Sequence, residues 1–204
     1  MSDPASTDDV VAEMRRAHGA HAVILYGSHA RGDATAESDV DVAAFADVSR
    51  VMRDARPWRG TYLDGFVYPT ATEPDPDLLK LVGGKILLDE RGTARALLDR
   101  LGELERRGPS PLADDEARMR RVWAEKTLAR IHRGDPEAHY RCHQLLVNLL
   151  EDYFALRGAW FRGAKVALAE LAQSSPDVFD AFVRAMAPAA PIDAVAQLVA
   201  LVIG

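Results

Sequence analysis

The segment Leu25–Phe45 reads LYGSHARGDATAESDVDVAAF and decides which fold the chain can adopt. It overlaps an apolar run, Ala22–Tyr26 (AVILY), whose branched residues are typical of a strand buried on both faces. The chain then turns at Gly27 and Ser28, leaves a gap long enough for a helix, and continues as DVDVAAF. Acidic and apolar residues alternate there as in a second strand. The segment therefore predicts two strands joined by a turn and a short helix.

The turn at Gly27 and Ser28 is a candidate for binding phosphate. Glycine lets the backbone approach a ligand closely, and Ser28 offers an amide and a hydroxyl at the start of the expected helix. Unpaired amides and the positive end of a helix dipole favour an anion at such a position. The turn lacks the lysine and the longer glycine spacing of the Walker loop, and it lacks the dinucleotide-binding fingerprint. By itself it indicates phosphate binding only weakly.

Asp39 and Asp41 are separated by one residue, so on a strand both carboxylates point to one face while Val40 and Val42 point to the core. The two acids then lie within about 7 Å of each other. Two neighbouring carboxylates favour a divalent cation, and oxygen ligands select Mg²⁺ or Mn²⁺. In the alternative interpretation, Asp39 caps a turn and Asp41 lies on a solvated strand edge.

The residues GSHARG (27–32) followed by SDVDV (38–42) resemble the signature of the polymerase-β-type nucleotidyltransferase superfamily. The similarity is greatest to the minimal bacterial members, which include aminoglycoside and lincosamide nucleotidyltransferases and antitoxin-type transferases. It covers residues from about 22 to 68. The resemblance implies that a nucleoside monophosphate is transferred from a nucleoside triphosphate with the help of Mg²⁺ or Mn²⁺, held by Asp39 and Asp41.

The family pattern also implies a third carboxylate on a later strand of the same sheet. Asp64, in TYLDGFVYP (61–69), is the best candidate, as a metal ligand close enough to help remove the proton of the attacking hydroxyl. Glu73 is the alternative third acid, and Asp64 could also be an acid on a mixed surface. Arg31 completes the family-like ARG and either approaches the triphosphate or pairs with Asp33 or Glu37 on the helix surface.

The chain changes character along its length. Strand signals end before Thr93, and RRGPSPLADDE (106–116) is typical of a hinge. We therefore predict an α+β protein: a small mixed sheet with helices in a catalytic domain (1–108), then an α-helical bundle in a substrate-binding domain (109–204). A first helix is expected from Asp8, ending before Gly19. Later helices are expected to begin near Asp114, Asp135-Pro136, Ser175-Pro176 and Pro191.

The helical half supplies weaker candidates. In the antibiotic-modifying relatives a carboxylate of the helical domain can act as the base, which makes Glu151 and Asp152 candidates here, and Lys165 could contact phosphate. They could equally be solvated neighbours of a core stripe at helical spacing, and Lys165 a surface lysine. The stripe consists of Leu149, Tyr153, Leu156 and Trp160.

The run HYRCH brings His139, Cys142 and His143 within about one helical turn, a spacing that can bind Zn²⁺. It lacks the glutamate of the His-Glu-x-x-His motif and an obvious fourth ligand. A buried histidine and an inert thiol are therefore the favoured interpretation. Because Cys142 is the only cysteine, an intramolecular disulfide is excluded.

Charge limits the class of substrate. The 204 residues carry a net charge of −6, and residues 1–90 hold nine basic and 16 acidic residues. An extended nucleic-acid surface would need clustered lysine and arginine, so a small substrate is favoured. The start, MSDPASTDD, does not resemble a signal peptide, and the apolar tail AVAQLVALVIG is too short to span a bilayer. We therefore expect a cytoplasmic protein that does not enter a membrane.

Together these observations predict a nucleotidyltransferase that moves AMP from ATP onto a hydroxyl of a small molecule and releases pyrophosphate. Two alternatives remain open. The chain could be an antitoxin-type transferase that modifies a protein or RNA, or a nucleotide-binding regulatory module without turnover. The apolar final helix from Pro191 to Ile203 could close the bundle or join two copies in a homodimer.

Overall fold

The structure is a computed structural model that describes residues 6–204, and the chain divides into two units, Met1–Arg107 and Gly108–Gly204. The first unit combines a sheet with helices and the second is helical, so the predicted α+β class is confirmed. The division of function between the two halves stays a prediction. The expectation about a signal peptide rests in part on residues 1–5, which lie outside the described residues.

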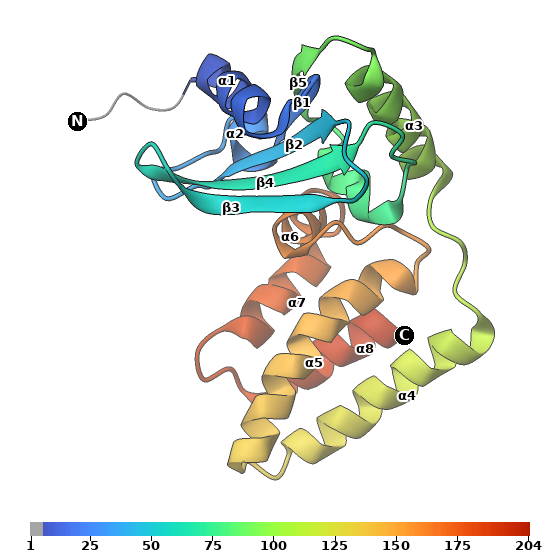
Figure 1. The fold of residues 1–204 in the computed structure, drawn as a ribbon. Coiled ribbons are helices and arrows are strands. Elements are labelled where there is room, and N and C mark those ends of the chain that lie inside the picture. The colour runs from blue at the N-terminus through green and yellow to red at the C-terminus, as the bar shows by residue number, and fades with distance from the viewer. Residues whose placement is uncertain (1–5) are drawn as a thin grey trace. The chain divides into compact units, whose positions relative to one another are not determined.

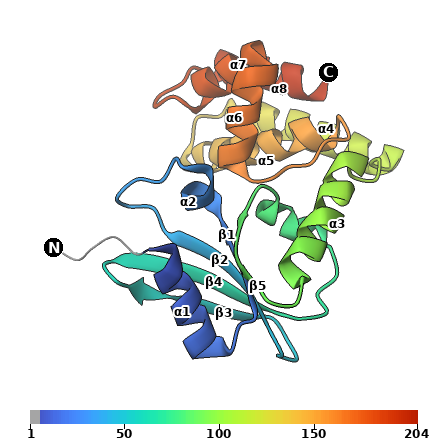
Figure 2. The same ribbon diagram turned by 90° about the horizontal axis from the view of Figure 1, so that it is seen from above.

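Five strands of the first unit form one mixed sheet in the order β3-β4-β2-β1-β5 (Figures 1 and 2). The central pair, β2 and β4, runs parallel, and every other neighbouring pair runs antiparallel. The strand bounds are β1 Ala22–Tyr26, β2 Val40–Ala46, β3 Met52–Trp58, β4 Thr61–Pro69 and β5 Lys85–Asp89.

The two strands predicted from the opening segment are β1 and β2. Val40 and Val42 are buried as the alternation predicted, but so is every other residue of β2 except Asp41. The reason is position: strands in the middle of a sheet are covered on both faces, and the polar alternation of a surface strand is lost there. Asp39 comes immediately before the first residue of β2.

The edge strand β3 was not predicted. Its sequence, MRDARPW, carries alternating charges and Pro57, which argue against a strand in the middle of a sheet. At an edge both features are tolerated, because one side of the strand donates no ladder hydrogen bonds and faces solvent. The strand β5 forms the other edge of the sheet and follows the double glycine at 83–84.

Helices flank this sheet, with bounds α1 Thr7–His18, α2 Gly27–Arg31, η1 Pro76–Leu81 (a 3₁₀ helix) and α3 Thr93–Arg107. The first helix is capped by Ser6 and ends at Gly19, whose φ of 65° is the left-handed conformation expected of a C-terminal glycine. The helix α3 packs against η1, β5 and β1 and so belongs to the first unit. No element was predicted for its residues.

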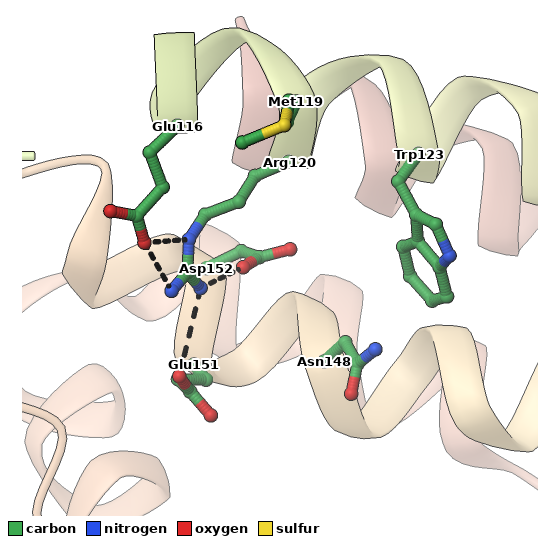
Figure 3. Close-up of a pocket in the computed structure, with 7 residues that line it drawn as sticks. All are labelled: Glu116, Met119, Arg120, Trp123, Asn148, Glu151 and Asp152. Carbon is green, nitrogen blue, oxygen red and sulfur yellow. Dashed lines mark hydrogen bonds and ion pairs between the residues drawn. The ribbon is translucent and has the colours of Figure 1, made fainter. Parts of the chain in front are cut away.

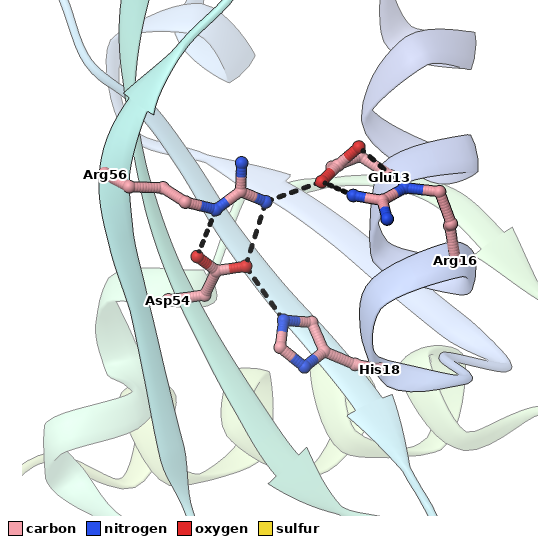
Figure 4. Close-up of polar contacts among 5 residues, drawn as sticks. All are labelled: Glu13, Arg16, His18, Asp54 and Arg56. Carbon is pink, nitrogen blue, oxygen red and sulfur yellow. Dashed lines mark hydrogen bonds and ion pairs between the residues drawn. The ribbon is translucent and has the colours of Figure 1, made fainter.

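A polar network joins α1 to the edge strand β3 (Figure 4). Arg56 donates to Glu13 Oε1 at 2.6 Å and to Asp54 Oδ1 at 2.7 Å, and His18 Nε2 lies 2.8 Å from Asp54 Oδ2. Arg16 pairs with the same Glu13 at 2.7 Å. An edge strand with so few apolar residues is therefore held to the helix by ionic contacts.

The second unit is a bundle of five helices, α4 Asp114–Ile131, α5 Pro136–Ala155, α6 Ala164–Ser174, α7 Pro176–Met186 and α8 Ile192–Ile203. The four predicted starts agree with α4, α5, α7 and α8. Both α4 and α7 pack against α8, and α4 also packs along α5. The shared core includes Leu145, Leu149, Phe182 and Leu198. No helix within residues 6–204 combines the length and the apolar character needed to cross a bilayer.

The predicted core stripe is correct only in part. Leu149 is fully buried and Tyr153 packs against the core, but α5 ends at Ala155. Leu156 caps the helix and Trp160 lies in the loop beyond it, where Gly158 has a φ of 63°. The glycine allows the chain to leave the helix before the stripe is complete.

Candidate active site

Three strands bring polar side chains side by side at one end of the sheet. Tyr26 on β1 pairs with Asp41 on β2, which in turn pairs with Asp64 on β4. Directly paired residues point to the same face of a sheet, and neighbouring strands lie about 4.8 Å apart. The second and third predicted acids, Asp41 and Asp64, are therefore neighbours in space although they are 23 residues apart in sequence.

The surroundings of Asp41 disfavour the ionised form of its carboxyl. Partial burial raises the pKa of its carboxyl above the ordinary value, and the negative charges of Asp64 and Asp39 raise it further. Arg31 and His29 act in the opposite direction but do not cancel the effect. A site that gathers negative charge in this way favours a bound cation.

The Gly-Ser turn contacts this acid. Gly27 has a φ of +68°, and a Cβ atom at this position would overlap the carboxylate of Asp41. The turn and Asp41 therefore lie in direct contact. Ser28 is buried, and its carbonyl oxygen accepts hydrogen bonds from the amides of Gly32 and Asp33.

The helix after the turn, α2, is shorter than the stretch of sequence between the turn and β2 suggested. Because α2 spans only five residues, its dipole contributes less to anion binding than a full helix would. The amides of the turn remain the candidate phosphate donors. Arg31 ends this helix and lies 3.3 Å from Asp33, which agrees with the surface pair, and it is also close enough to lower the pKa of Asp41.

Asp64 has a partner that the sequence did not indicate. Arg53 on β3 donates from Nε to Oδ1 at 3.1 Å and from Nη2 to Oδ2 at 3.0 Å, which engages both carboxylate oxygens. The alternative third acid, Glu73, is exposed in the loop after β4 and pairs with Arg100 of α3. Asp64 is thus the acid that the sheet brings to Asp41. Arg53 was missed because its strand was missed.

Oxygen donors at this site suit a hard divalent cation. Asp41 and Asp64 are neighbours, and Asp39 is close enough to raise the pKa of Asp41. No three His, Cys, Asp or Glu side chains within residues 6–204 are already gathered as a metal centre. Asp64 would have to leave Arg53 to join the other two. With that change, the three carboxylates fit Mg²⁺ or Mn²⁺ by charge and by donor type.

The helical unit contains a second candidate pocket, with a volume of about 430 Å³ (Figure 3). Arg120 of α4 lies at its centre and contacts three carboxylates. It lies 3.0 Å from Glu116, 3.6 Å from Glu151 and 2.6 Å from Asp152. The remaining lining residues are Met119, Trp123 and Asn148.

The two predicted base candidates therefore share a pocket but differ in environment. Asp152 is 4% exposed, and burial raises the pKa of its carboxyl although the bond from Arg120 opposes the shift. An acid that is buried and paired in this way is poorly placed to take a proton from a substrate. Glu151 is exposed at the pocket, and Lys165 lies in the first turn of α6 and does not line the pocket.

His139, Cys142 and His143 line a different cavity of the helical unit, about 460 Å³ in volume and mostly apolar. Burial raises the pKa of the Cys142 thiol, which favours the unreactive form. The raised pKa agrees with the expected inert thiol, but His139 and His143 are both exposed, so the expected buried histidine is wrong.

The match to a known family falls on the unit that holds the acid pair. Residues 8–94 match the family described as nucleotidyltransferase domain. Together with the strand, the Gly-Ser turn and the paired acids, this defines the first unit as a nucleotidyltransferase domain of the polymerase-β type. Transfer of a nucleoside monophosphate is the activity that such a domain supports.

Among solved structures, the chain is similar to a nucleotidyltransferase-like protein from Exiguobacterium sibiricum. The two are 13% identical with a TM-score of 0.40, over 97% of this chain and 70% of the other. A similarity this low says nothing about substrate. No curated protein matches the chain.

Proposed function

We propose that the protein transfers a nucleoside monophosphate, with ATP as the expected donor, onto a hydroxyl group of a small molecule. The observation that carries the proposal is the pairing of Asp41 with Asp64, together with the approach of Gly27 to Asp41, inside the matched domain. In the transfer, the hydroxyl oxygen bonds to the α-phosphorus, the bond from that phosphorus to the β-phosphate oxygen breaks, and pyrophosphate leaves with the electron pair.

Each group of the site has a role in this proposal. The amides at Gly27 and Ser28 hold the β- and γ-phosphates, and Asp39, Asp41 and Asp64 hold Mg²⁺ or Mn²⁺. Such cations, when bound, neutralise charge that develops on the phosphate oxygens and favour ionisation of the attacking hydroxyl. The carboxylate of Asp64 receives the hydroxyl proton and passes it to water. No covalent enzyme intermediate is needed.

Several features support a small acceptor. The net charge of −6 and the absence of a basic sequence cluster do not suit a long nucleic acid. The pocket of the helical unit has a volume suited to a small molecule and exposes Glu151 as an alternative base. We extend the proposal to a cytoplasmic location and to a homodimer.

The proposal is tested by incubating the protein with Mg²⁺ and each of the four common nucleoside triphosphates. The acceptor mixture contains bacterial metabolites, aminoglycosides and lincosamides. Pyrophosphate release and an acceptor heavier by one nucleoside monophosphate are expected. Asp41→Asn should abolish both. Asp47→Asn is the matched control, because Asp47 follows the other end of β2 and pairs with Arg91 at 2.8 Å, away from the acid pair.

The other outcomes separate the alternatives. Nucleotide attached to a protein or to RNA, with no modified small molecule, would favour an antitoxin-type transferase. Nucleotide binding without pyrophosphate release under any condition would favour a regulatory module. Normal turnover by Asp64→Asn would remove Asp64 from the site and move the third-acid role to Glu73.

A further inference from the structure

Two cationic side chains lie beside the acid pair, on the same face of the sheet. Phe66 follows Asp64 by two residues on β4, so its ring shares that face. The guanidinium carbon of Arg53 lies 5.4 Å from the centre of the Phe66 ring, and Lys80 Nζ of η1 lies 4.2 Å from it. Lys80 Nζ is also 5.8 Å from the ring centre of Tyr26, the register neighbour of Asp41.

The two cations are held in different ways. Arg53 uses Nε and Nη2 to bind Asp64, which leaves Nη1 outside that pair. Lys80 is exposed and forms no ion pair with any carboxylate of residues 6–204, and it contacts aromatic rings instead. A ring face attracts an ammonium group but occupies few of its N–H donors. The donors of Lys80 thus remain available to an anion.

The strand order places Arg53 relative to the reaction, whereas Lys80 contacts rings on both β4 and β1. The Gly-Ser turn follows β1, the acids lie on β2 and β4, and Arg53 lies on β3, beyond β4 from the turn. In an in-line displacement the attacking and leaving oxygens lie on opposite sides of the phosphorus. If the leaving phosphates lie at the turn, the acceptor approaches from the side of β4 and β3, where Arg53 is.

We propose that Arg53 and Lys80 bind an anionic group of the acceptor, a phosphate or a carboxylate. The acceptor would then be an anionic compound that carries a free hydroxyl. This inference rests on the proposed function for the direction of attack. It also gives Arg53 a second role: when the anion binds the guanidinium, the carboxylate of Asp64 is released for the cation and for the hydroxyl proton.

The test uses hydroxyl compounds in matched pairs that differ by one anionic group. Suitable pairs are glycerol 3-phosphate with glycerol, glucose 6-phosphate with glucose, and gluconate with sorbitol, and kanamycin serves as a cationic probe. Binding is measured by calorimetry with Mg²⁺ and a non-hydrolysable triphosphate analogue present. Transfer is measured by mass spectrometry with ATP. At least one anionic member should bind ten or more times tighter than its neutral partner.

Single variants then assign the effect to the two cations. Arg53→Gln and Lys80→Gln should each weaken binding of the anionic member at least tenfold and leave nucleotide affinity unchanged. Arg59→Gln is the matched control. Arg59 lies 3.0 Å from Asp9 and 5.9 Å from the Trp58 ring, so it makes contacts of the same kind beside the turn between β3 and β4.

Equal binding of the anionic and neutral members of every pair, or preference for kanamycin, would overturn the inference. A loss of nucleotide affinity in Arg53→Gln and Lys80→Gln would also overturn it and assign the cations to the phosphates of the donor. Failure of the proposed function would be seen separately. In that case the wild type would release no pyrophosphate with any acceptor, while the calorimetric arm would still decide whether the anion binds.

Discussion

At the scale of single residues, Gly27 is the glycine at which an added Cβ atom would make the shortest contact. It combines a φ of +68° with a backbone so close to Asp41 that a methyl group would overlap the carboxylate. Gly60, in the turn between β3 and β4, has a φ of +82° and open space around it. A comparison of Gly27 with Gly60 therefore separates the effect of a left-handed backbone from the effect of crowding.

We therefore expect Gly60→Ala to lower the free energy of unfolding by about 1–2 kcal/mol, the cost of a left-handed conformation with a side chain. Gly27→Ala should lower it by a further ~1–3 kcal/mol because the methyl group crowds Asp41. Chemical denaturation of both variants at neutral pH measures the difference. The extra cost should shrink when Asp41 is also changed to alanine. An equal effect at both glycines would show that Asp41 does not press against the turn.

The parts of the site that the sequence predicted are those set by local spacing. Gly27 lies in the turn after β1 and Asp41 lies on β2, and Asp39 comes immediately before that strand. Arg53 and Lys80 reach the same face only through the pairing of β3 with β4 and the return of η1, which are tertiary contacts. No spacing in a single sequence indicates them.

At the scale of elements, the network between α1 and β3 links stability to pH. Burial alone would raise the pKa of Asp54, but hydrogen bonds from Arg56 and His18 outweigh burial and hold the pKa below its ordinary value. An acid whose pKa is lower in the folded chain stabilises the fold above its unfolded pKa, about 3.9. That contribution is lost as the pH falls through the folded value.

Asp54→Asn should therefore lower the free energy of unfolding by about 1–3 kcal/mol at pH 7, because Arg56 and His18 lose their bond to a partly buried carboxylate. The deficit should narrow as the pH falls below about 4, because the unfolded chain gains the proton first and folded Asp54 gains it at a lower pH. Urea denaturation at pH 7 and pH 3 tests this, with Asp99→Asn, exposed on α3, as the control. If Asp54→Asn were less stable than the wild type by the same amount at pH 7 and pH 3, the ionisation of Asp54 would not contribute to stability.

The helix pair α4 and α5 depends on one arginine. Arg120 offsets the charge of Asp152, which is 4% exposed, and it also contacts Glu116 and Glu151. Arg120→Ala would leave a buried carboxylate without its partner, which typically costs about 3–5 kcal/mol. Arg118→Ala, a neighbour on the same helix, should have little effect. Thermal unfolding followed by circular dichroism compares the two, and equal melting temperatures would show that Arg120 is not required.

Helices and strands were predicted correctly where the local sequence signal matched the place of the element in the fold. The starts of α5 and α7 were recognised because proline and a capping residue mark them. The strand β3 was not recognised, because its charges and its proline usually argue against a strand and are tolerated only at the edge of a sheet. The extent of α5 was overestimated, since apolar spacing continued past Ala155 while the glycines beyond it ended the helix.

At the scale of the whole molecule, the acid pair should connect ligand binding to global stability. The pKa of Asp41 is raised by burial and by Asp64 and Asp39, so its folded-state pKa exceeds the unfolded one. For an acid this means that the ionised form destabilises the fold as the pH rises above the unfolded value, about 3.9. Without a cation, the wild type is therefore less stable at neutral pH than a variant with a neutral side chain in place of Asp41.

We expect Mg²⁺ and a triphosphate to reverse the order of stability of the wild type and Asp41→Asn. In the presence of a chelator at pH 7.5, Asp41→Asn should be more stable than the wild type by about 0.5–1 kcal/mol, since it removes repulsion within the acid pair. With Mg²⁺ and a non-hydrolysable triphosphate at 100 times their dissociation constants, the wild type should gain about 2.7 kcal/mol and become the more stable. Asp47→Asn should behave as the wild type in both conditions. Denaturation curves measured with chelator and with Mg²⁺ provide the comparison. If Mg²⁺ stabilised Asp41→Asn as much as the wild type, the cation would bind elsewhere, and the metal site assigned to Asp39, Asp41 and Asp64 would be wrong.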